Sequence, residues 1–271
     1  MTDTPMTPVT TTTEPHAQSV VEQGAAFPWF AVFKRELVLY FRSPIAYGIA
    51  FAILFLLGLL FNGYVTQGNG QFPADSTYAP GLLTFLTFLI APLLTMRLIA
   101  EESREGTVEV LMTLPMNESQ FIIGKFLAAW AYYTVLLLLT LVYHFMMLTI
   151  GTPDLGAAFG AYLGAWLYAG AVLAVTMIWS AVTEDQIVAA FLGAATVLVL
   201  YLSQIAVSWL SQQPGISGLA ELVRELGLQA HYDATLAQGI IRAEDILYFV
   251  FMIVGALFIT TRIVETRRWR S

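Results

Sequence analysis

Six long apolar runs dominate the pattern of hydrophobic and polar positions in this chain. They cover residues 44–64, 81–100, 122–150, 155–182, 187–210 and 246–264. A helix crosses the core of a bilayer with about 20 consecutive apolar residues. The runs are continuous rather than alternating, which favours helices over a transmembrane barrel. The pattern therefore predicts an all-α, polytopic membrane protein with six transmembrane helices.

Two shorter segments are amphipathic. In residues 29–42 the apolar side chains recur at helical spacing and the basic ones lie largely on another face, which is typical of a helix in the headgroup layer. The apolar positions are Phe30, Phe33, Leu37 and Phe41, and the basic ones are Lys34, Arg35 and Arg42. Ser43 and Pro44 suit the N-cap and first residue of the following span. A second pattern, from Leu219 to Leu226, predicts a short external helix before the last span.

Two further helix starts carry capping signals. Asn117 and Gln120 have the spacing of a capping box before the third span, and Thr183 and Gln186 have it before the fifth. Glu184 and Asp185 are then expected in the first turn of the fifth helix, where negative charge meets the positive end of the helix dipole. These signals place both starts to within a few residues.

Composition and charge agree with a membrane protein. Hydrophobic residues make up 58% of the 271 residues and charged residues 11%, whereas soluble domains have roughly 45–50% and about 25%. The chain has no cysteine, which excludes disulfides, thiol catalysis and zinc–thiolate sites. Ten of the 12 Lys and Arg residues lie on one side if both termini are cytoplasmic, which is the orientation that the positive-inside rule favours. Residues 1–26 are expected to form a disordered polar tail, and residues 27–271 a single transmembrane domain.

A charged connector separates the second and third apolar runs. Seven charges fall between Arg97 and Glu118 in a chain that has few. Arg97 and Glu101 are four residues apart, so they can pair along a helix that leaves the membrane. Gly106 permits a bend and Pro115 marks an end, which together predict a helix, a bend and a second short helix across the membrane surface. A solvated loop with ordinary ion pairs explains the charges alone equally well.

Three motifs, in this order, resemble the permease subunits of type-2 ABC exporters, and most closely the gliding-motility-associated group. The first runs from Ala100 to Pro115, A-E-E-x-x-x-G-T-x-E-x-L-x-T-x-P, and is followed by G-K-F-L at residues 124–127. The second is T-E-D-Q-I-V-A-A at residues 183–190, and the third is G-I-I-x-x-x-D-I-L-Y-F at residues 239–249. The resemblance covers about residues 28–265. The chain has Gln238 where the group often has a basic residue.

The resemblance implies a function for the charged connector. In such exporters the loop between spans two and three is a coupling helix, which inserts into a groove of a cytosolic ABC ATPase. The residues that would make or shape this contact are Glu101, Glu102, Arg104, Glu105, Gly106, Thr107 and Glu109. The resemblance also implies a second permease subunit, identical or different, and ATP and Mg²⁺ bound by the ATPase rather than by this chain. The expected location is a bacterial-type inner membrane, with no nucleic-acid partner.

Polar residues within the spans suggest other functions, which stay open at this point. His144, Ser203 and Gln204 are candidates for a substrate path because polar groups in membrane spans are costly. An ATP-independent channel or ion-coupled transporter would need more such groups, and an intramembrane enzyme would need Ser203 and His144 to meet. The chain has no P-loop motif and only three His, so we expect neither its own ATP hydrolysis nor a metal centre. The substrate cannot be read from uniformly apolar spans.

Overall fold

The computed structural model describes residues 28–68, 75–106, 117–212 and 217–268, and in these residues it is helical with no strand. Six helical stretches are long and apolar enough to cross a membrane, which confirms the predicted number of spans. Their helices are α3 (Pro44–Gly68), α4 (Tyr78–Thr95) with the short α5 (Ala100–Glu105), α7 (Glu118–Leu139) with α8 (Leu141–Ile150), α9 (Leu155–Val182), α10 (Gln186–Leu210) and α13 (Ala243–Arg268). The remaining elements are α2 (Pro28–Arg42), α11 (Ser217–Leu226), α12 (Leu228–Asp233) and the 3₁₀ turn η1 (Leu236–Gln238).

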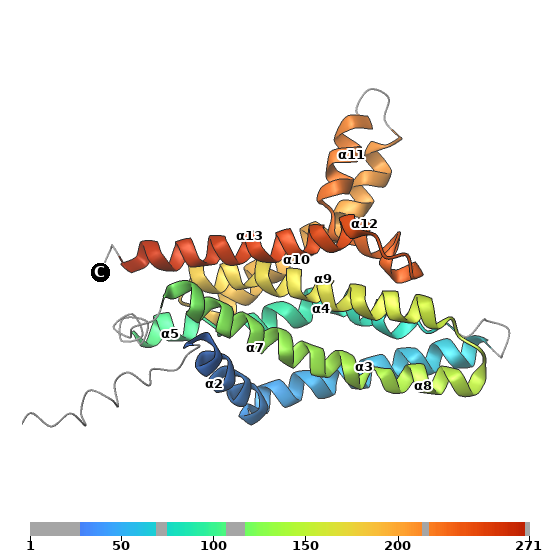
Figure 1. Cartoon of the computed structure of the whole chain (residues 1–271), viewed down its shortest axis with the longest axis horizontal. Helices are drawn as coiled ribbons and strands as arrows, with labels where there is room; N and C mark the ends of the chain where they lie inside the picture. The colour runs from blue at the N-terminus through green and yellow to red at the C-terminus, as the bar shows by residue number, and fades with distance from the viewer. Residues whose placement is uncertain (1–27, 69–74, 107–116, 213–216, 269–271) are drawn as a thin grey trace, which may run out of the picture.

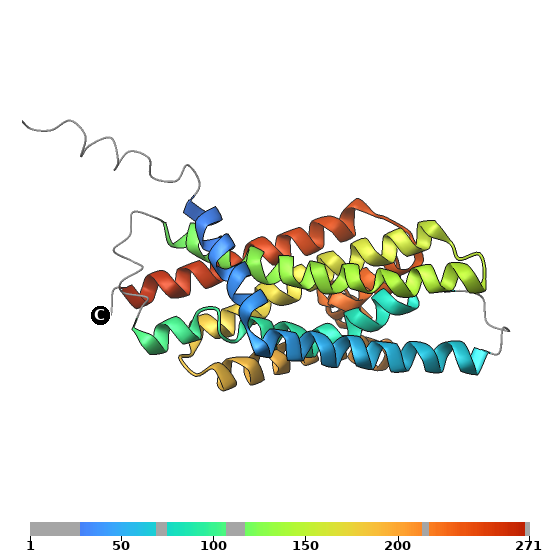
Figure 2. The same cartoon turned by 90° about the horizontal axis from the view of Figure 1, so that it is seen from below.

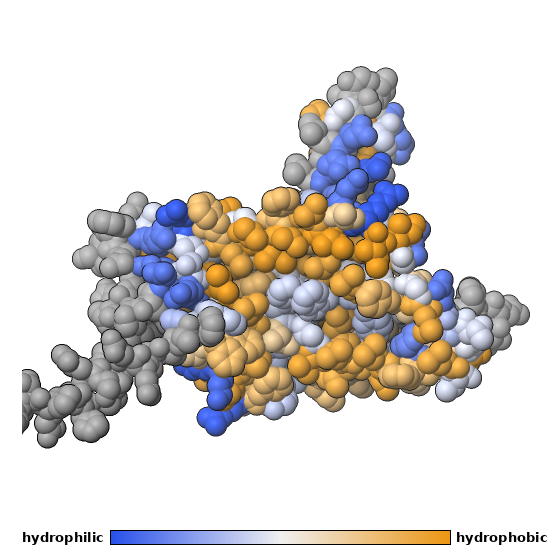
Figure 3. Space-filling view, viewed as in Figure 1, coloured by the Kyte–Doolittle hydropathy of each residue, from blue (hydrophilic) through white to orange (hydrophobic). Residues whose placement is uncertain are grey.

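The spans lie alongside one another in one bundle, and α2 crosses the bundle at the end where α5 and the C-terminus lie (Figures 1 and 2). α11 stands out from the bundle on one side, next to the end of α10 that packs against it (Figure 1). Hydrophobic residues cover the length of the bundle, while hydrophilic residues gather at its end near α2 and on α11 (Figure 3). The hydrophobic length of the bundle fits sides that face lipid, and the hydrophilic end near α2 fits a position in water.

α9 is the central helix. It packs against α4, α7, α10 and α13, and most of the residues in its apolar stretch are buried. Its sequence is rich in Gly and Ala, which lets neighbouring backbones approach closely. A Cβ atom added at Gly160 would lie 2.6 Å from Gly239 Cα, and one at Gly164 would lie 2.7 Å from Leu236 Cβ. These two small residues therefore pack within the subunit, against η1 and the turn that follows it.

α2 has the predicted position, but only part of its apolar face meets the bundle, where Phe33 and Leu37 pack partly buried against the core. Phe30 and Phe41 are exposed, whereas Glu36 and Tyr40 are buried against the bundle. The reason is a close crossing with α7, where a Cβ atom added at Gly124 would lie 2.7 Å from a backbone oxygen of α2. The exposed aromatic residues remain available to lipid, as expected for an interfacial helix.

Several predicted helix starts hold, but the capping chemistry differs. α3 begins at Pro44 and α7 at Glu118, although the Asn117 side chain accepts no capping hydrogen bond. α10 begins at Gln186 with Asp185 as its N-cap, so Asp185 precedes the first turn rather than lying in it. The Asp185 carboxylate accepts from two backbone N–H groups, while the Thr183 hydroxyl accepts from Asp185 N–H. Asp185, which lies closer to the helix, thus takes the N-cap role that the capping-box spacing assigned to Thr183.

Candidate functional site

The candidate site is the junction of α4 and α5, where the chain changes from a membrane span to a charged connector. α4 ends at Thr95, residues 96–99 form a turn, and α5 begins at Ala100. α5 ends at Glu105, and the φ of 68° at its C-cap Gly106 lies in the left-handed region that glycine adopts without strain. The helix therefore breaks off at Gly106, as the sequence predicts. The second short helix, at residues 108–115, lies outside the described residues.

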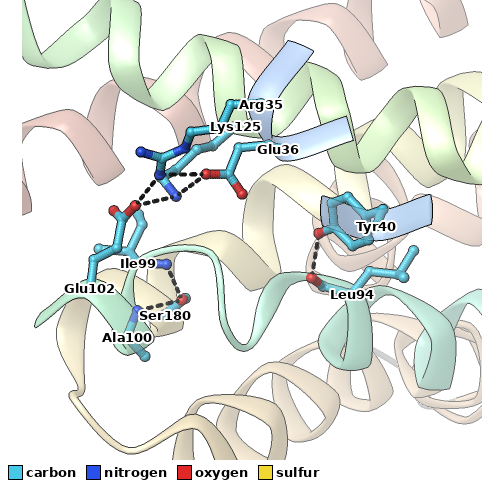
Figure 4. Close-up of polar contacts among 9 residues, drawn as sticks. All are labelled: Arg35, Glu36, Tyr40, Leu94, Ile99, Ala100, Glu102, Lys125 and Ser180. Carbon is cyan, nitrogen blue, oxygen red and sulfur yellow. Dashed lines mark hydrogen bonds and ion pairs between the residues drawn. The ribbon is translucent and has the colours of Figure 1, made fainter. Parts of the chain in front are cut away.

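A serine of α9 holds the start of α5. The backbone N–H groups of Ile99 and Ala100 both donate to Ser180 Oγ, at 3.0 and 3.1 Å (Figure 4). The same hydroxyl donates to the Met96 carbonyl oxygen at 3.1 Å. A buried side chain thus satisfies backbone groups that the turn leaves without helical partners. The position of α5 is in this way fixed to the central helix of the bundle.

Four charged side chains from three helices meet beside this serine contact. Lys125 Nζ of α7 lies 2.9 Å from Glu36 Oε1 of α2 and 2.9 Å from Glu102 Oε1 of α5. Arg35 Nη2 lies 3.0 Å from the same Glu36 oxygen and 2.9 Å from the same Glu102 oxygen (Figure 4). We call these four residues the ion-pair cluster. It joins α2, α5 and α7, which are distant in the sequence.

The ion-pair cluster pairs two cations with two anions, and three of its members are largely removed from water, whereas Arg35 is 51% exposed. The Lys125 side chain is 2% exposed, and those of Glu36 and Glu102 are nearly as buried. Burial alone would raise the pKa of the Glu36 carboxyl, but Lys125 and Arg35 outweigh it and hold that pKa below its ordinary value. Removing Lys125 would leave the buried carboxylates of Glu36 and Glu102 without their buried cation, which is a costly change.

Tyr40 fixes α2 to the end of α4. Its hydroxyl donates to the Leu94 carbonyl oxygen at 2.6 Å (Figure 4). The Arg97 guanidinium lies over the Tyr40 ring, 4.9 Å from its centroid, and Arg97 Nη1 donates to Ser43 Oγ at 3.2 Å. The expected pairing of Arg97 with Glu101 is not found among the described ion pairs, because the turn at residues 96–99 separates the two and helical spacing does not apply across it.

The structure divides the expected coupling residues into groups. Glu102 is buried in the ion-pair cluster and Glu101 is half-buried, whereas Arg104, Glu105 and Gly106 are exposed. Thr107 and Glu109 lie outside the described residues. Sequence reasoning did not find the contributions of Glu36, Lys125 and Ser180. A signal existed for two of them, since Lys125 is the one cation of an apolar run and Glu36 is the one acid of α2.

The candidates for a substrate path are not brought together. His144 lies on α8, half-buried, and its Nδ1 atom is buried with no hydrogen-bond partner in the described residues. The Ser203 hydroxyl, on α10, donates to the Leu200 carbonyl oxygen at 2.6 Å. The side chain of Gln204 lies outside the described residues. Across the part of the chain that is described, no hydrogen bond joins Ser203 to His144, and no cluster of His, Asp or Glu could hold a metal ion.

Comparison with known proteins supports a transport function. Residues 58–265 match the family described as ABC-2 family transporter protein. A probable ABC transporter permease protein NosY of Pseudomonas aeruginosa is 36% identical over 89 residues, and one of Stutzerimonas stutzeri is 35% identical over 88 residues. The alignments cover 32% and 31% of this chain and 32% of each relative. The chain thus spans about a third of the length of the curated relatives it matches.

Proposed function

The chain belongs to the ABC-2 family of transporter proteins as a multi-pass membrane subunit, and we propose that a separate cytosolic ATPase drives it to export a substrate. ATP and Mg²⁺ would bind to the ATPase, and two permease subunits would enclose the path. The motifs at residues 100–115, 183–190 and 239–249 support the gliding-motility-associated group as the nearest branch. The asymmetry of Lys and Arg supports a bacterial inner membrane location with both termini in the cytoplasm.

The observation that carries this proposal is the way α5 is attached. Ser180 links the start of α5 to α9, and Glu102 links α5 to α2 and α7. A displacement of α5 by an ATPase would therefore reach three other helices through short, buried contacts. Packed helices with buried polar contacts move as units rather than deforming continuously, so α5 is suited to transmit motion into the bundle.

The attachment of α5 also indicates which residues would meet the ATPase. Glu102 is occupied inside the protein, so its contribution is to hold α5 in place. Arg104, Glu105 and Gly106 are exposed, and Thr107 and Glu109 follow directly in the sequence. We assign the ATPase contact to Arg104, Gly106 and the residues that follow them in the sequence. Charged residues at such a surface select the partner and its orientation more than they add affinity.

The proposal is tested by co-purifying the full chain with a candidate ATPase and measuring ATP hydrolysis. Arg104→Glu together with Glu109→Lys should lower the stimulation of hydrolysis by about tenfold, which corresponds to the loss of one close charge pair at an interface. This double variant should still insert and elute as the wild type does. Glu221→Lys on α11, at an exposed position far from α5 in the sequence, serves as the charge-reversal control.

Two results would contradict the proposal. One is unchanged stimulation in the Arg104→Glu, Glu109→Lys variant, which would remove α5 as the coupling element. The other is substrate movement by the purified chain without an ATPase, which would favour the channel or ion-coupled transporter instead.

A further inference from the structure

A charged cleft of about 570 Å³ opens between α2 and α5, at the end of the bundle where these helices meet. Its lining includes four cations and four anions. Half of these are the ion-pair cluster, whose charges neutralise one another. The other half are Arg42, Arg97, Glu101 and Glu105. Any ligand of the cleft would therefore meet two cations and two anions that the cluster does not use.

These four residues make no ion pair within the described residues. Arg42 and Glu105 are exposed, and Glu101 and Arg97 are half-buried. Arg97 is held in place by its hydrogen bond to Ser43 and its contact with the Tyr40 ring. A guanidinium already fixed in position loses little side-chain freedom when it binds an anion. The cleft thus presents a pre-positioned cation, with carboxylates lining the same space.

A narrow apolar slot of about 80 Å³ continues from the cleft. Arg97 and Glu101 line both spaces, so the two are adjacent. The rest of the slot is mainly apolar and includes Ile45, Ile49 and Leu93. Ile45 is 61% exposed at the start of α3, so the slot reaches the side of the bundle that faces lipid.

The depth of these residues follows from the ends of the spans. α3 begins at Pro44, directly after Arg42 and Ser43, and α4 ends at Thr95, two residues before Arg97. Lys and Arg at such positions lie at the level of phospholipid headgroups. The cleft therefore lies at the membrane surface and the slot lies just below it, whichever leaflet this end of the bundle occupies.

We propose that the cleft and the slot together bind one phospholipid whose headgroup carries a primary ammonium, such as phosphatidylethanolamine. The phosphate would meet Arg97 and Arg42, because guanidinium groups match phosphate oxygens in charge and geometry. The ammonium would meet Glu101 and Glu105 in the cleft, and the start of an acyl chain would enter the slot. Arg97 and Glu101 line both spaces, so a cation and a carboxylate lie where the slot meets the cleft.

The charges also indicate which headgroups bind less well. Phosphatidylglycerol is anionic and offers no cation to Glu101 and Glu105, so these carboxylates would repel it. Phosphatidylcholine carries a quaternary ammonium that has no N–H group to donate to a carboxylate. Two carboxylates beside two guanidinium groups therefore favour a zwitterion with hydrogen-bond donors.

The test uses the purified full chain in detergent, incubated with equal amounts of phosphatidylethanolamine, phosphatidylglycerol and phosphatidylcholine that have the same acyl chains. Native mass spectrometry then counts the retained lipids. The wild type should retain phosphatidylethanolamine about tenfold over each of the others, the effect of one charge-assisted hydrogen bond. Glu101→Gln with Glu105→Gln should abolish this preference, and Arg42→Gln should reduce retention of all three. Glu221→Gln and Lys34→Gln are exposed controls and should leave retention unchanged.

Three outcomes would overturn the proposal. Equal retention of the three lipids by the wild type would show that the headgroup is not recognised. Free phosphoethanolamine that competes as well as the lipid would identify a site for a soluble phosphate compound, with no use of the slot. Retention unaffected by Glu101→Gln with Glu105→Gln, together with loss of ATPase co-purification, would identify the cleft as a protein contact. The lipid assay contains no ATPase, so its failure and a failure of coupling at Arg104 are separate results.

Discussion

Lys125 illustrates how a single residue acquires its role from distant parts of the chain. In the sequence it is an isolated cation near the start of an apolar run, and the charge asymmetry places it at the membrane surface. In the structure its side chain is almost fully buried between the carboxylates of Glu36 and Glu102. The sequence predicts where the charge lies along the span, but the two partners come from helices whose packing it does not reveal.

Replacing Lys125 should be among the most destabilising single changes in this chain. Lys125→Met removes the buried ammonium that both carboxylates contact and leaves Arg35 as the remaining cation of the cluster. The loss of one member of a buried ion pair costs about 3–5 kcal/mol of unfolding free energy. Chemical unfolding of the purified full chain measures this change, with Lys34→Met, at an exposed position of α2, as the matched control. Equal stability of the two variants would contradict the structural role of the cluster.

Glu36 should make the stability of the protein sensitive to acid. Burial raises the pKa of its carboxyl, but Lys125 and Arg35 outweigh this and leave the pKa below the ordinary value of 4.5. The folded state therefore binds fewer protons than the unfolded state in this range, and ionised Glu36 contributes stability that is fully present above pH 4.5. That contribution is lost as the pH falls below 4.5 through the lowered pKa.

The unfolding midpoints of the wild type and of Glu36→Gln, measured from neutral to acidic pH, test this dependence. The wild type should be the more stable at neutral pH, by a difference that stays constant down to the ordinary pKa and shrinks below it. A difference that grows on acidification would show that Glu36 has the opposite shift.

At the scale of elements, the sequence predicts helices well and helix faces less well. The bounds of α9 are those of the apolar run, residues 155–182. Asp154 caps the start of the helix, and the residues remain apolar up to its end. The buried face of α2 is harder to predict. Its apolar residues can be covered either by lipid or by protein, so their pattern does not decide which face packs against the bundle. Its buried face, with Glu36 and Tyr40, is chosen by the close crossing at Gly124, and no periodicity in α2 itself encodes that crossing.

The close contact between α9 and η1 gives a prediction at this scale. A Cβ atom at Gly160 would lie 2.6 Å from Gly239 Cα and 2.7 Å from the Leu236 backbone oxygen, so the backbone itself would have to move. Gly160→Ala should therefore lower the unfolding free energy by about 1–3 kcal/mol, as overpacking usually does. Gly48→Ala is the matched control, because its Cβ would meet nothing within 4 Å and alanine suits a helix interior. Equal stability of the two variants would show that α9 and η1 are farther apart than described.

At the scale of the whole molecule, the number of spans follows from the apolar runs, but their arrangement does not. Six runs of similar hydropathy give no order of packing, and only the structure shows α9 at the centre of the bundle. The candidate site depends on that arrangement, since it needs α2, α5, α7 and α9 to meet at one end. The family motifs allowed α5 to be predicted, because the first motif contains the charged residues of α5. The motifs do not include Ser180, whose hydroxyl can be recognised as functional only once its hydrogen bonds to the turn before α5 are seen.

The orientation of the bundle remains a prediction of the charge asymmetry, and the absence of cysteine makes it directly testable. Single cysteines at Arg104 on α5 and at Glu221 on α11 are exposed positions, and α5 and α11 are expected on opposite sides of the membrane. With both termini in the cytoplasm, Glu221→Cys should react with a membrane-impermeant maleimide in spheroplasts, and Arg104→Cys should react only after the membrane is opened. The cysteine-free wild type gives the background. The reverse labelling would place α5 outside the cell, where no ATPase could drive it, and the proposed coupling through Ser180 and the ion-pair cluster would then have no source of motion.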